Sequence, residues 1–102
     1  MSDDIKVGFE IRSMLIMRDT LKEMGIDFTE INDQTVSIER PYHNIVINGE
    51  TNEVSLDSEN KPELDKILQN YQVAWYKDQL IREGNKITEE VSVNGEVIIR
   101  VR

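Results

Sequence analysis

The only histidine of this sequence, His43, is the side chain best suited to exchange a proton near neutral pH. It follows Pro41 and Tyr42 and could serve as a general base or a switch, and a carboxylate and a serine could complete a nucleophilic site around it. The chain has no cysteine and no second histidine. We therefore favour the simpler interpretation, a loop histidine without a chemical role.

Two acidic pairs could bind a metal ion or exchange protons. Asp57 and Glu59 alternate as in a calcium loop, but Lys61 takes a ligand position and Pro62 stands where such loops need a glycine. The Glu89-Glu90 dyad lies in a predicted strand, where neighbouring side chains point to opposite faces. Phosphate-binding glycine loops and H-E-x-x-H are absent. We expect no metal, no cofactor and no enzyme activity.

The composition is that of one globular domain, residues 1–102, with 38% hydrophobic and 31% charged residues. No apolar run approaches the roughly 20 residues of a membrane helix. The acidic N-terminus lacks the layout of a signal peptide. Together with the absence of cysteine, these features predict a cytoplasmic protein.

Negative charge is concentrated in the middle of the sequence. Residues 19–65 hold twelve acidic residues against three basic ones, a net charge of −9, and the whole chain carries −8. This imbalance disfavours direct binding to nucleic acid or to a membrane, and it favours a basic protein as partner. The alternative is that the charge only keeps the surface soluble.

The longest predicted element is a helix over Pro62–Arg82. Its apolar residues recur at spacings of three and four, proline suits its first turn, and Gly84 can end it. Asp78 falls on the apolar face, either as a buried acid paired with a base or where that face reaches solvent. The face consists of Leu64, Ile67, Leu68, Tyr71, Ala74, Trp75 and Ile81.

Shorter elements precede this helix. Alternating apolar residues predict a first strand over Ile5–Ile11, and Ser13 can cap a helix that ends near Met24, before Gly25. A four-residue loop over 49–52 sets the apolar residues of two later strands against each other. These later strands are predicted over residues 26–31, 35–40, 44–48 and 53–57.

The chain closes with a predicted hairpin, Lys86–Val93 with Glu96–Arg102. A two-residue turn at Asn94-Gly95 would place the apolar residues of the two strands on opposite faces. We therefore expect a three-residue loop with a bulge, which pairs Val91 with Val97. The full order, β-α-β-β-β-β-α-β-β, predicts an α+β two-layer sandwich, a mostly antiparallel sheet with two helices on one face.

The acidic residues are predicted to form a surface. If Ile38, Ile47, Val54 and Leu56 face the helices, acidic side chains of the same strands point outward, about 6.8 Å apart along a strand. Such an array would resemble the row of phosphates along a DNA strand, with about twice the spacing between charges. The alternative is a charged face that only prevents edge-to-edge aggregation. The predicted partner-binding residues are Glu39, Glu50, Glu53, Asp57, Glu59, Glu63, Asp65, Glu90 and Glu96.

Both ends of the sequence carry a recognisable arrangement of helices, strands and glycines. A first strand leads into a helix that closes with the segment 21–25, and a long helix precedes a glycine, paired glutamates and a glycine hairpin. Over about half of the chain this resembles a family of small uncharacterised proteins encoded in red-algal plastids, cyanobacteria and some large phages. In size and charge the chain also resembles phage host-takeover proteins, some of which mimic DNA. The matching positions are Leu68, Tyr71, Gly84, Glu89, Glu90, Gly95 and Arg100.

Three functions follow from these observations. The first is an acidic binding protein that occupies the nucleic-acid-binding surface of a basic partner, such as a histone-like nucleoid protein, and that salt weakens. The alternative is an adaptor or assembly subunit that binds through an apolar helix face, Val73, Tyr76 and Leu80, with little dependence on salt. The third is a small enzyme centred on Tyr42 and His43. An exposed edge strand, the first or last of the sheet, could also pair two copies as a homodimer.

Overall fold

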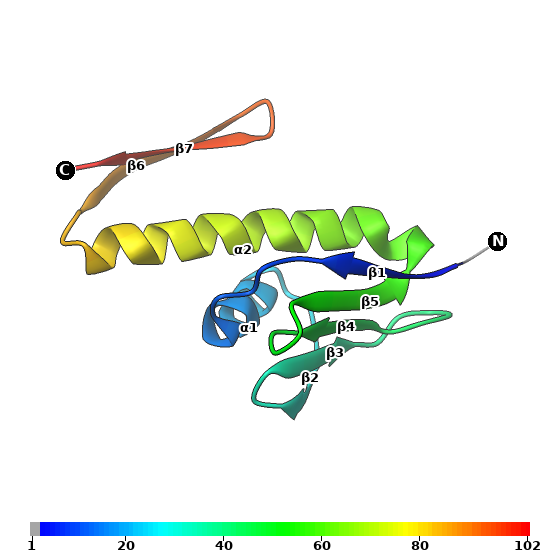
Figure 1. Ribbon diagram of the computed structural model, residues 1–102. Coiled ribbons are helices and arrows are strands. Elements are labelled where there is room, and N and C mark those ends of the chain that lie inside the picture. Colours follow the sequence, from blue (N-terminus) through cyan, green and yellow to red (C-terminus); the bar gives the residue numbers. More distant parts are fainter. Residues whose placement is uncertain (1–2) are drawn as a thin grey trace.

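The computed structural model describes residues 3–102 as a sheet with two helices on one face and a separate hairpin beyond the longer helix (Figure 1). The α+β class and the predicted order of helices and strands are confirmed. The elements are β1 (Asp4–Gly8), α1 (Met14–Glu23), β2 (Thr29–Asn32), β3 (Thr35–Ile38), β4 (Ile45–Asn48), β5 (Glu53–Asp57), the short 3-10 helix η1 (Ser58–Asn60), α2 (Lys61–Arg82), β6 (Ile87–Val93) and β7 (Glu96–Val101).

Both helices begin and end as their terminal residues predict. The Ser13 hydroxyl accepts a hydrogen bond from the Ile16 N–H at 3.2 Å and so caps α1. Gly25 and Gly84 follow the two helices with φ of +73° and +88°, a conformation that favours glycine. Neither α1 nor α2, the helices described in residues 3–102, is long and apolar enough to cross a membrane.

The larger sheet has the strand order β1-β5-β4-β3-β2, and every pairing in it is antiparallel. Ile47 pairs with Val54, and Asn48 pairs with Glu53, so the predicted four-residue loop over 49–52 is confirmed. β1 and β2 form the edges of this sheet. Of the two strands named as possible edges, the first, β1, does lie at an edge, and the last, β7, belongs to a separate two-stranded sheet.

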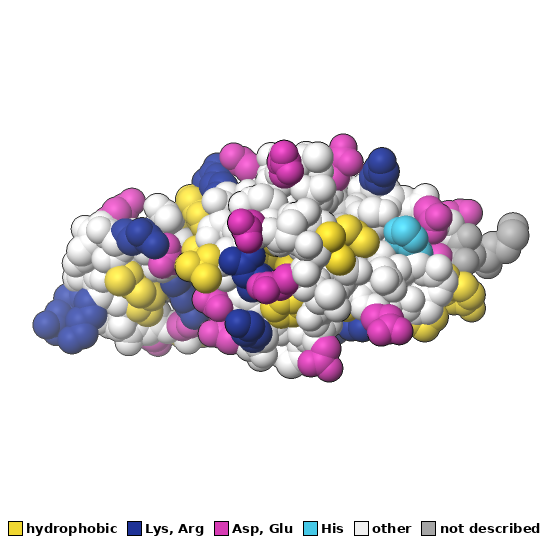
Figure 2. Space-filling view, turned by 90° about the horizontal axis from the view of Figure 1, so that it is seen from below, with side chains coloured by type: hydrophobic (Ala, Val, Ile, Leu, Met, Phe, Trp, Pro, Cys, Tyr) yellow, Lys and Arg dark blue, Asp and Glu magenta, His cyan; other side chains and the backbone are white. Residues whose placement is uncertain are grey.

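The second half of α2 and the hairpin extend past the sheet (Figures 1 and 2). We call residues 72–102 the arm and residues 3–71 the body. The molecule measures 47 × 32 × 23 Å, and its radius of gyration is 14.7 Å. A compact domain of this length has a radius of about 13 Å. The arm accounts for the more elongated shape.

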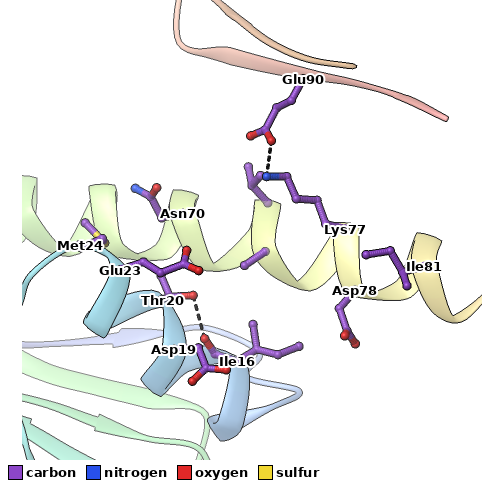
Figure 3. A pocket seen from close by; sticks show the side chains of 12 residues that line it. Ile16, Asp19, Thr20, Glu23, Met24, Asn70, Lys77, Asp78, Ile81 and Glu90 are labelled. Atoms are coloured by element: carbon purple, nitrogen blue, oxygen red, sulfur yellow. Dashed lines mark hydrogen bonds and ion pairs between the residues drawn. The ribbon is translucent and has the colours of Figure 1, made fainter. Parts of the chain in front are cut away.

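Polar contacts hold the hairpin against α2. Lys77 Nζ forms an ion pair with Glu90 Oε2 (Figure 3), and the Gln69 side-chain amide donates to the Gly95 carbonyl at 2.7 Å. Both ion-paired side chains stay partly exposed, 31% and 42%. Exposed pairs of this kind contribute about 0–1 kcal/mol each, so the attachment is weak.

The hairpin covers the helix face predicted for an adaptor. Val73 and Leu80 lie on the same side of α2 as Gln69, four and eleven residues along the helix. Both are half-buried, whereas Tyr76 remains 52% exposed. The chain's own hairpin therefore occupies part of the surface that the sequence predicts for a partner.

The predicted three-residue loop of this hairpin is wrong. Val93 pairs with Glu96 across a two-residue turn, and Val91 pairs with Ile98 instead of Val97. The turn residues Asn94 and Gly95 have φ of +52° and +80°, as a type I′ hairpin turn requires. No face of the hairpin is buried in a core, so apolar segregation does not set its register and the turn does.

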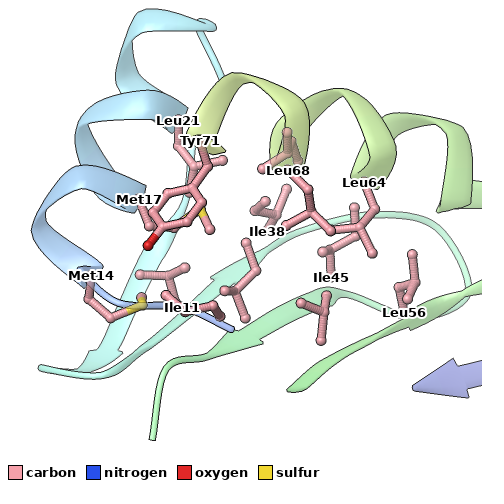
Figure 4. Close-up of a cluster of buried hydrophobic side chains, with 14 residues drawn as sticks. Ile11, Met14, Met17, Leu21, Ile38, Ile45, Leu56, Leu64, Leu68 and Tyr71 are labelled. Carbon is pink, nitrogen blue, oxygen red and sulfur yellow. The ribbon is translucent and has the colours of Figure 1, made fainter. Parts of the chain in front are cut away.

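One hydrophobic core lies between the sheet and the two helices (Figure 4). Every described buried hydrophobic residue falls between Ile11 and Tyr71, which places the whole core in the body. The last residues of the predicted helix face differ: Trp75 only packs at the core's margin and Ile81 is 59% exposed. The buried set is Ile11, Met14, Met17, Leu21, Val36, Ile38, Ile45, Ile47, Val54, Leu56, Leu64, Ile67, Leu68 and Tyr71.

Candidate functional site

The sheet face opposite the helices is polar but only weakly acidic. Across its middle runs one row of paired residues: Lys6, Ser55, Val46, Ser37 and Thr29. Three of the five side chains carry a hydroxyl, one is a lysine, and none carries a carboxylate. The phosphate-like array predicted for this face therefore has a gap of neutral and basic residues at its centre.

Five of the nine predicted partner-binding residues keep an uncompensated charge. They are exposed, and in the part of the chain that the structure describes none of them pairs with a lysine or arginine. These five are Glu39, Glu50, Glu53, Glu59 and Glu96. By contrast, seven of the chain's twelve lysines and arginines pair with other carboxylates.

Two predicted residues do not face outward. Asp57 is only 1% exposed, and its Oδ1 accepts the Glu59 N–H at 2.9 Å, which caps the 3-10 helix after β5. Glu90 turns toward α2 and pairs with Lys77 (Figure 3). The outward orientation predicted for Asp57 is wrong because its oxygen caps a helix N-terminus. The orientation predicted for Glu90 is wrong because the hairpin adopts the register with the two-residue turn.

Glu63 and Asp65 are occupied by cations of their own chain. Arg40 holds both carboxylate oxygens of Glu63, with nitrogen–oxygen distances of 2.8 and 2.7 Å. These hydrogen bonds lower the pKa of Glu63 and raise that of Arg40. Asp65 pairs with Lys61 one turn earlier in α2. Both carboxylates stabilise the start of α2 and are poorly available to a partner.

The stability of the Glu63–Arg40 pair should depend on pH in one direction. Because folding lowers the Glu63 pKa, the pair stabilises fully above the ordinary value of 4.5, and its contribution disappears as pH falls through the lower folded value. We expect Glu63→Gln to lower the thermal midpoint at pH 7, and the difference should vanish as pH falls below 4.5 and through the lower folded pKa of Glu63. Asp65→Asn, which removes an exposed pair, is the control and should change little. A Glu63→Gln difference that persists at low pH would contradict this assignment.

The uncompensated carboxylates do not form one continuous patch. On the face drawn in Figure 2, Asp and Glu side chains are spread out, with Lys and Arg between many of them. β3 and β5 end where β1 and β4 begin, so Glu39 and Glu59 share one end of the sheet. Glu50 and Glu53 lie at the opposite end, and Glu96 lies at the hairpin turn.

The sheet end of Glu39 and Glu59 also holds His43. Its Nε2 hydrogen-bonds the Ser55 hydroxyl at 2.8 Å, and its Nδ1 lies 4.0 Å from Asp4 Oδ1. Figure 2 shows this histidine near the end of the molecule, with acidic side chains beside it. We call the side chains of Asp4, Glu39 and Glu59 the acidic end; each is exposed. The sequence alone does not reveal Asp4 as a member.

The order Asp4, His43, Ser55 matches a nucleophilic triad in residue type. A serine nucleophile also needs free N–H donors to hold an oxyanion. Ser55 lies in β5, which is paired on both sides, so the N–H groups around it belong to the sheet ladders. The hydrogen bond fits a different role better: it fastens the segment after β3 to the sheet face.

Tyr42 has an unusual backbone within that segment. Its φ is +69°, and the His43 N–H donates to the Pro41 carbonyl across it at 2.8 Å, which closes a γ-turn. A bulky residue with positive φ is an outlier. The side chain is 79% exposed. Sequence reasoning misses this turn, because Pro41 signals only the end of a strand.

Two grooves flank the arm. The first, about 520 Å³, lies between α1 and the hairpin side of α2, and both acidic and apolar side chains line it (Figure 3). In it Asp78 pairs with Arg82, so the acid predicted on the helix face is both paired and half-exposed. Its acidic residues are Asp19, Glu23, Asp78 and Glu90.

The second groove, about 550 Å³, is aromatic. Phe9, Tyr71, Trp75 and Tyr76 line it, and the Arg12 guanidinium lies 4.6 Å over the Trp75 ring. Tyrosine, tryptophan and arginine are the residues most often found at the centre of protein interfaces. This groove is therefore the best apolar surface for a partner in the described part of the chain.

Comparisons with known proteins leave the family open. No protein-family model matches the chain, and searches of curated proteins and of solved structures find no match. The resemblance to small plastid, cyanobacterial and phage proteins therefore stays a prediction. Within residues 3–102, no three His, Asp or Glu side chains gather as metal ligands.

Proposed function

We propose that this chain is an acidic, non-enzymatic binding protein whose partner is a basic protein. Its contact would occupy the surface with which that partner holds nucleic acid. The observation that carries the proposal is the acidic end, where Asp4, Glu39 and Glu59 are exposed and their carboxylates form no ion pair with a lysine or arginine among residues 3–102.

The distribution of charge supports this site over the rest of the surface. Beside the acidic end, Glu63 pairs with Arg40, and in the arm Glu90 pairs with Lys77. Carboxylates without a local cation attract a basic surface over about 10 Å at 0.1 M salt. Asp4 begins β1 and Glu39 follows β3, and these two strands are three inter-strand spacings of about 4.8 Å apart in the sheet. The acidic end therefore spans a width comparable to several phosphates of one DNA strand.

Capture from a bacterial lysate tests the proposal. The chain is immobilised and loaded at about 0.1 M and about 0.5 M salt, with and without duplex DNA. Two variants lose the same charge at different places: Glu39→Gln with Glu59→Gln at the acidic end, and Glu50→Gln with Glu53→Gln at the opposite end. We expect a DNA-binding protein that salt and DNA both displace, and that only the first variant fails to hold.

The matched variants separate a site from mere net charge. Equal losses in both variants would mean that the overall charge of −8 attracts the partner without a defined contact. Retention of the same protein by the acidic-end variant, or capture that ignores DNA, would rule out the proposal.

A second function is favoured by the aromatic groove. If the chain is an adaptor, Tyr76 and its groove neighbours would bind an apolar segment, and the contact would persist at about 0.5 M salt. Tyr76→Ala should then abolish capture while the acidic-end variant retains it. This pattern is the reverse of the one expected for the first function.

A further inference from the structure

We propose that Tyr42 is the anchor of this interface and that it receives arginine side chains of the partner. The guanidinium would stack on the exposed ring while the acidic end holds its charge. The inference rests on the proposed function, because it names the chemical group by which the basic partner is recognised.

The backbone at Tyr42 is unsuited to a tyrosine on folding grounds. At φ +69° a side chain crowds its own backbone, and glycine would adopt the turn without that cost. The ring gives no burial in return, since 79% of the residue is exposed, more than any other large hydrophobic residue described. Residues in such conformations cluster at functional sites.

Hydrogen bonds on both sides fix the turn that presents the ring. His43 is bonded to Ser55 on β5 at 2.8 Å. Asn44 accepts the Arg40 N–H with its Oδ1 at 3.2 Å and donates to the Ser37 hydroxyl at 3.3 Å. A group held in this way loses little conformational freedom when it binds, which favours affinity.

Two carboxylates of the acidic end belong to residues near the Tyr42 turn. Asp4 lies 4.0 Å from the neighbouring His43, and Glu39 is three residues earlier and exposed. The Arg40 guanidinium is engaged by both carboxylate oxygens of Glu63 and by the backbone carbonyl of Glu39 at 2.7 Å. A cation that reaches the ring therefore meets Glu39, which forms no ion pair among residues 3–102, and Asp4, whose described partner is His43.

Arginine fits this arrangement better than lysine. Its planar, weakly hydrated guanidinium stacks on aromatic faces and bonds carboxylates in a fork, whereas lysine is a compact, strongly hydrated charge. The chain builds the same combination internally: Arg12 lies 4.6 Å over Trp75 and 3.1 Å from a Glu10 oxygen. The interface would repeat this contact between two proteins.

Two labelled peptides of equal charge, octa-arginine and octa-lysine, test the inference with the full chain. Fluorescence anisotropy at about 0.1 M salt gives both dissociation constants. We expect octa-arginine to bind about twofold to fivefold more tightly, the range of an exposed cation–π contact. Tyr42→Leu and Tyr42→Gly should remove most of this preference. Ile31→Ala, which shortens an exposed hydrophobic side chain of the edge strand β2, is the control and should keep it.

Each outcome has a separate meaning. A preference that survives both Tyr42 variants overturns the anchor and leaves the acidic partner surface intact. Failure of both peptides to bind the wild-type chain overturns the proposed function together with the anchor. Thermal denaturation adds a readout: Tyr42→Gly should melt at the same temperature or higher, and a clear fall would assign the tyrosine a structural role instead.

Discussion

Tyr71→Ala is expected to lower the free energy of unfolding by about 3–5 kcal/mol, the range for deleting a buried aromatic ring. Tyr71 is 3% exposed and points from α2 toward α1 (Figure 4). Its ring meets Phe9 edge-on, with centroids 5.8 Å apart. Since small domains are stable by about 5–15 kcal/mol in total, this one change could unfold a large fraction of the molecules.

The hydroxyl of Tyr71 should account for part of this loss in the free energy of unfolding, and this part can be measured separately. It accepts the Arg12 N–H at 2.8 Å and the Ser13 N–H at 3.1 Å, at the start of α1. Tyr71→Phe keeps the ring but leaves these two donors without their acceptor, at a cost of about 1–3 kcal/mol. Urea denaturation of both variants gives the two numbers. Equal stability of wild type and Phe variant would show that water replaces the hydroxyl and that it does not hold α1.

The sequence predicts the body of this protein well because a core determines it. The caps at Ser13, Gly25 and Gly84 and the loop over 49–52 obey local rules that the apolar faces reinforce. These agreements arise where a residue on the wrong face would lose burial. The register of β6 and β7 is mispredicted for the opposite reason: no core lies behind it, and the turn Asn94-Gly95 decides.

The candidate site is only partly predictable. The alternation of apolar and polar residues in the strands correctly predicts that Glu39 and Glu53 are exposed. No sequence pattern indicates that Asp57 caps η1, or that Glu63 binds Arg40, which lies 23 residues away in the sequence. Such pairings depend on which loops come together in space. The γ-turn at Tyr42 is likewise set by His43 reaching Ser55 on β5, a contact that sequence spacing does not show.

The hairpin should exchange its amide hydrogens at least about a hundredfold faster than β4 and β5. Its strands bury no residue completely, and its described ties to α2 are mainly the exposed Lys77–Glu90 pair and the bond from Gln69. An isolated hairpin is marginally stable, so its local opening should cost no more than about 2 kcal/mol. The core strands open only with the whole body, at about 5 kcal/mol or more, and each 1.4 kcal/mol is a factor of ten.

Ending the chain at Gly84 turns this difference in stability into a test of where the partner binds. The removed residues, 85–102, carry three acidic and three basic side chains, so the net charge of −8 is unchanged. The core is complete without them, and the shortened chain should unfold cooperatively with nearly the original stability.

Because Val73 and Leu80 then lose their cover, we expect self-association in sedimentation measurements. Octa-arginine binding should persist, since Tyr42 and the acidic end lie in the body; its loss would move the interface to the arm.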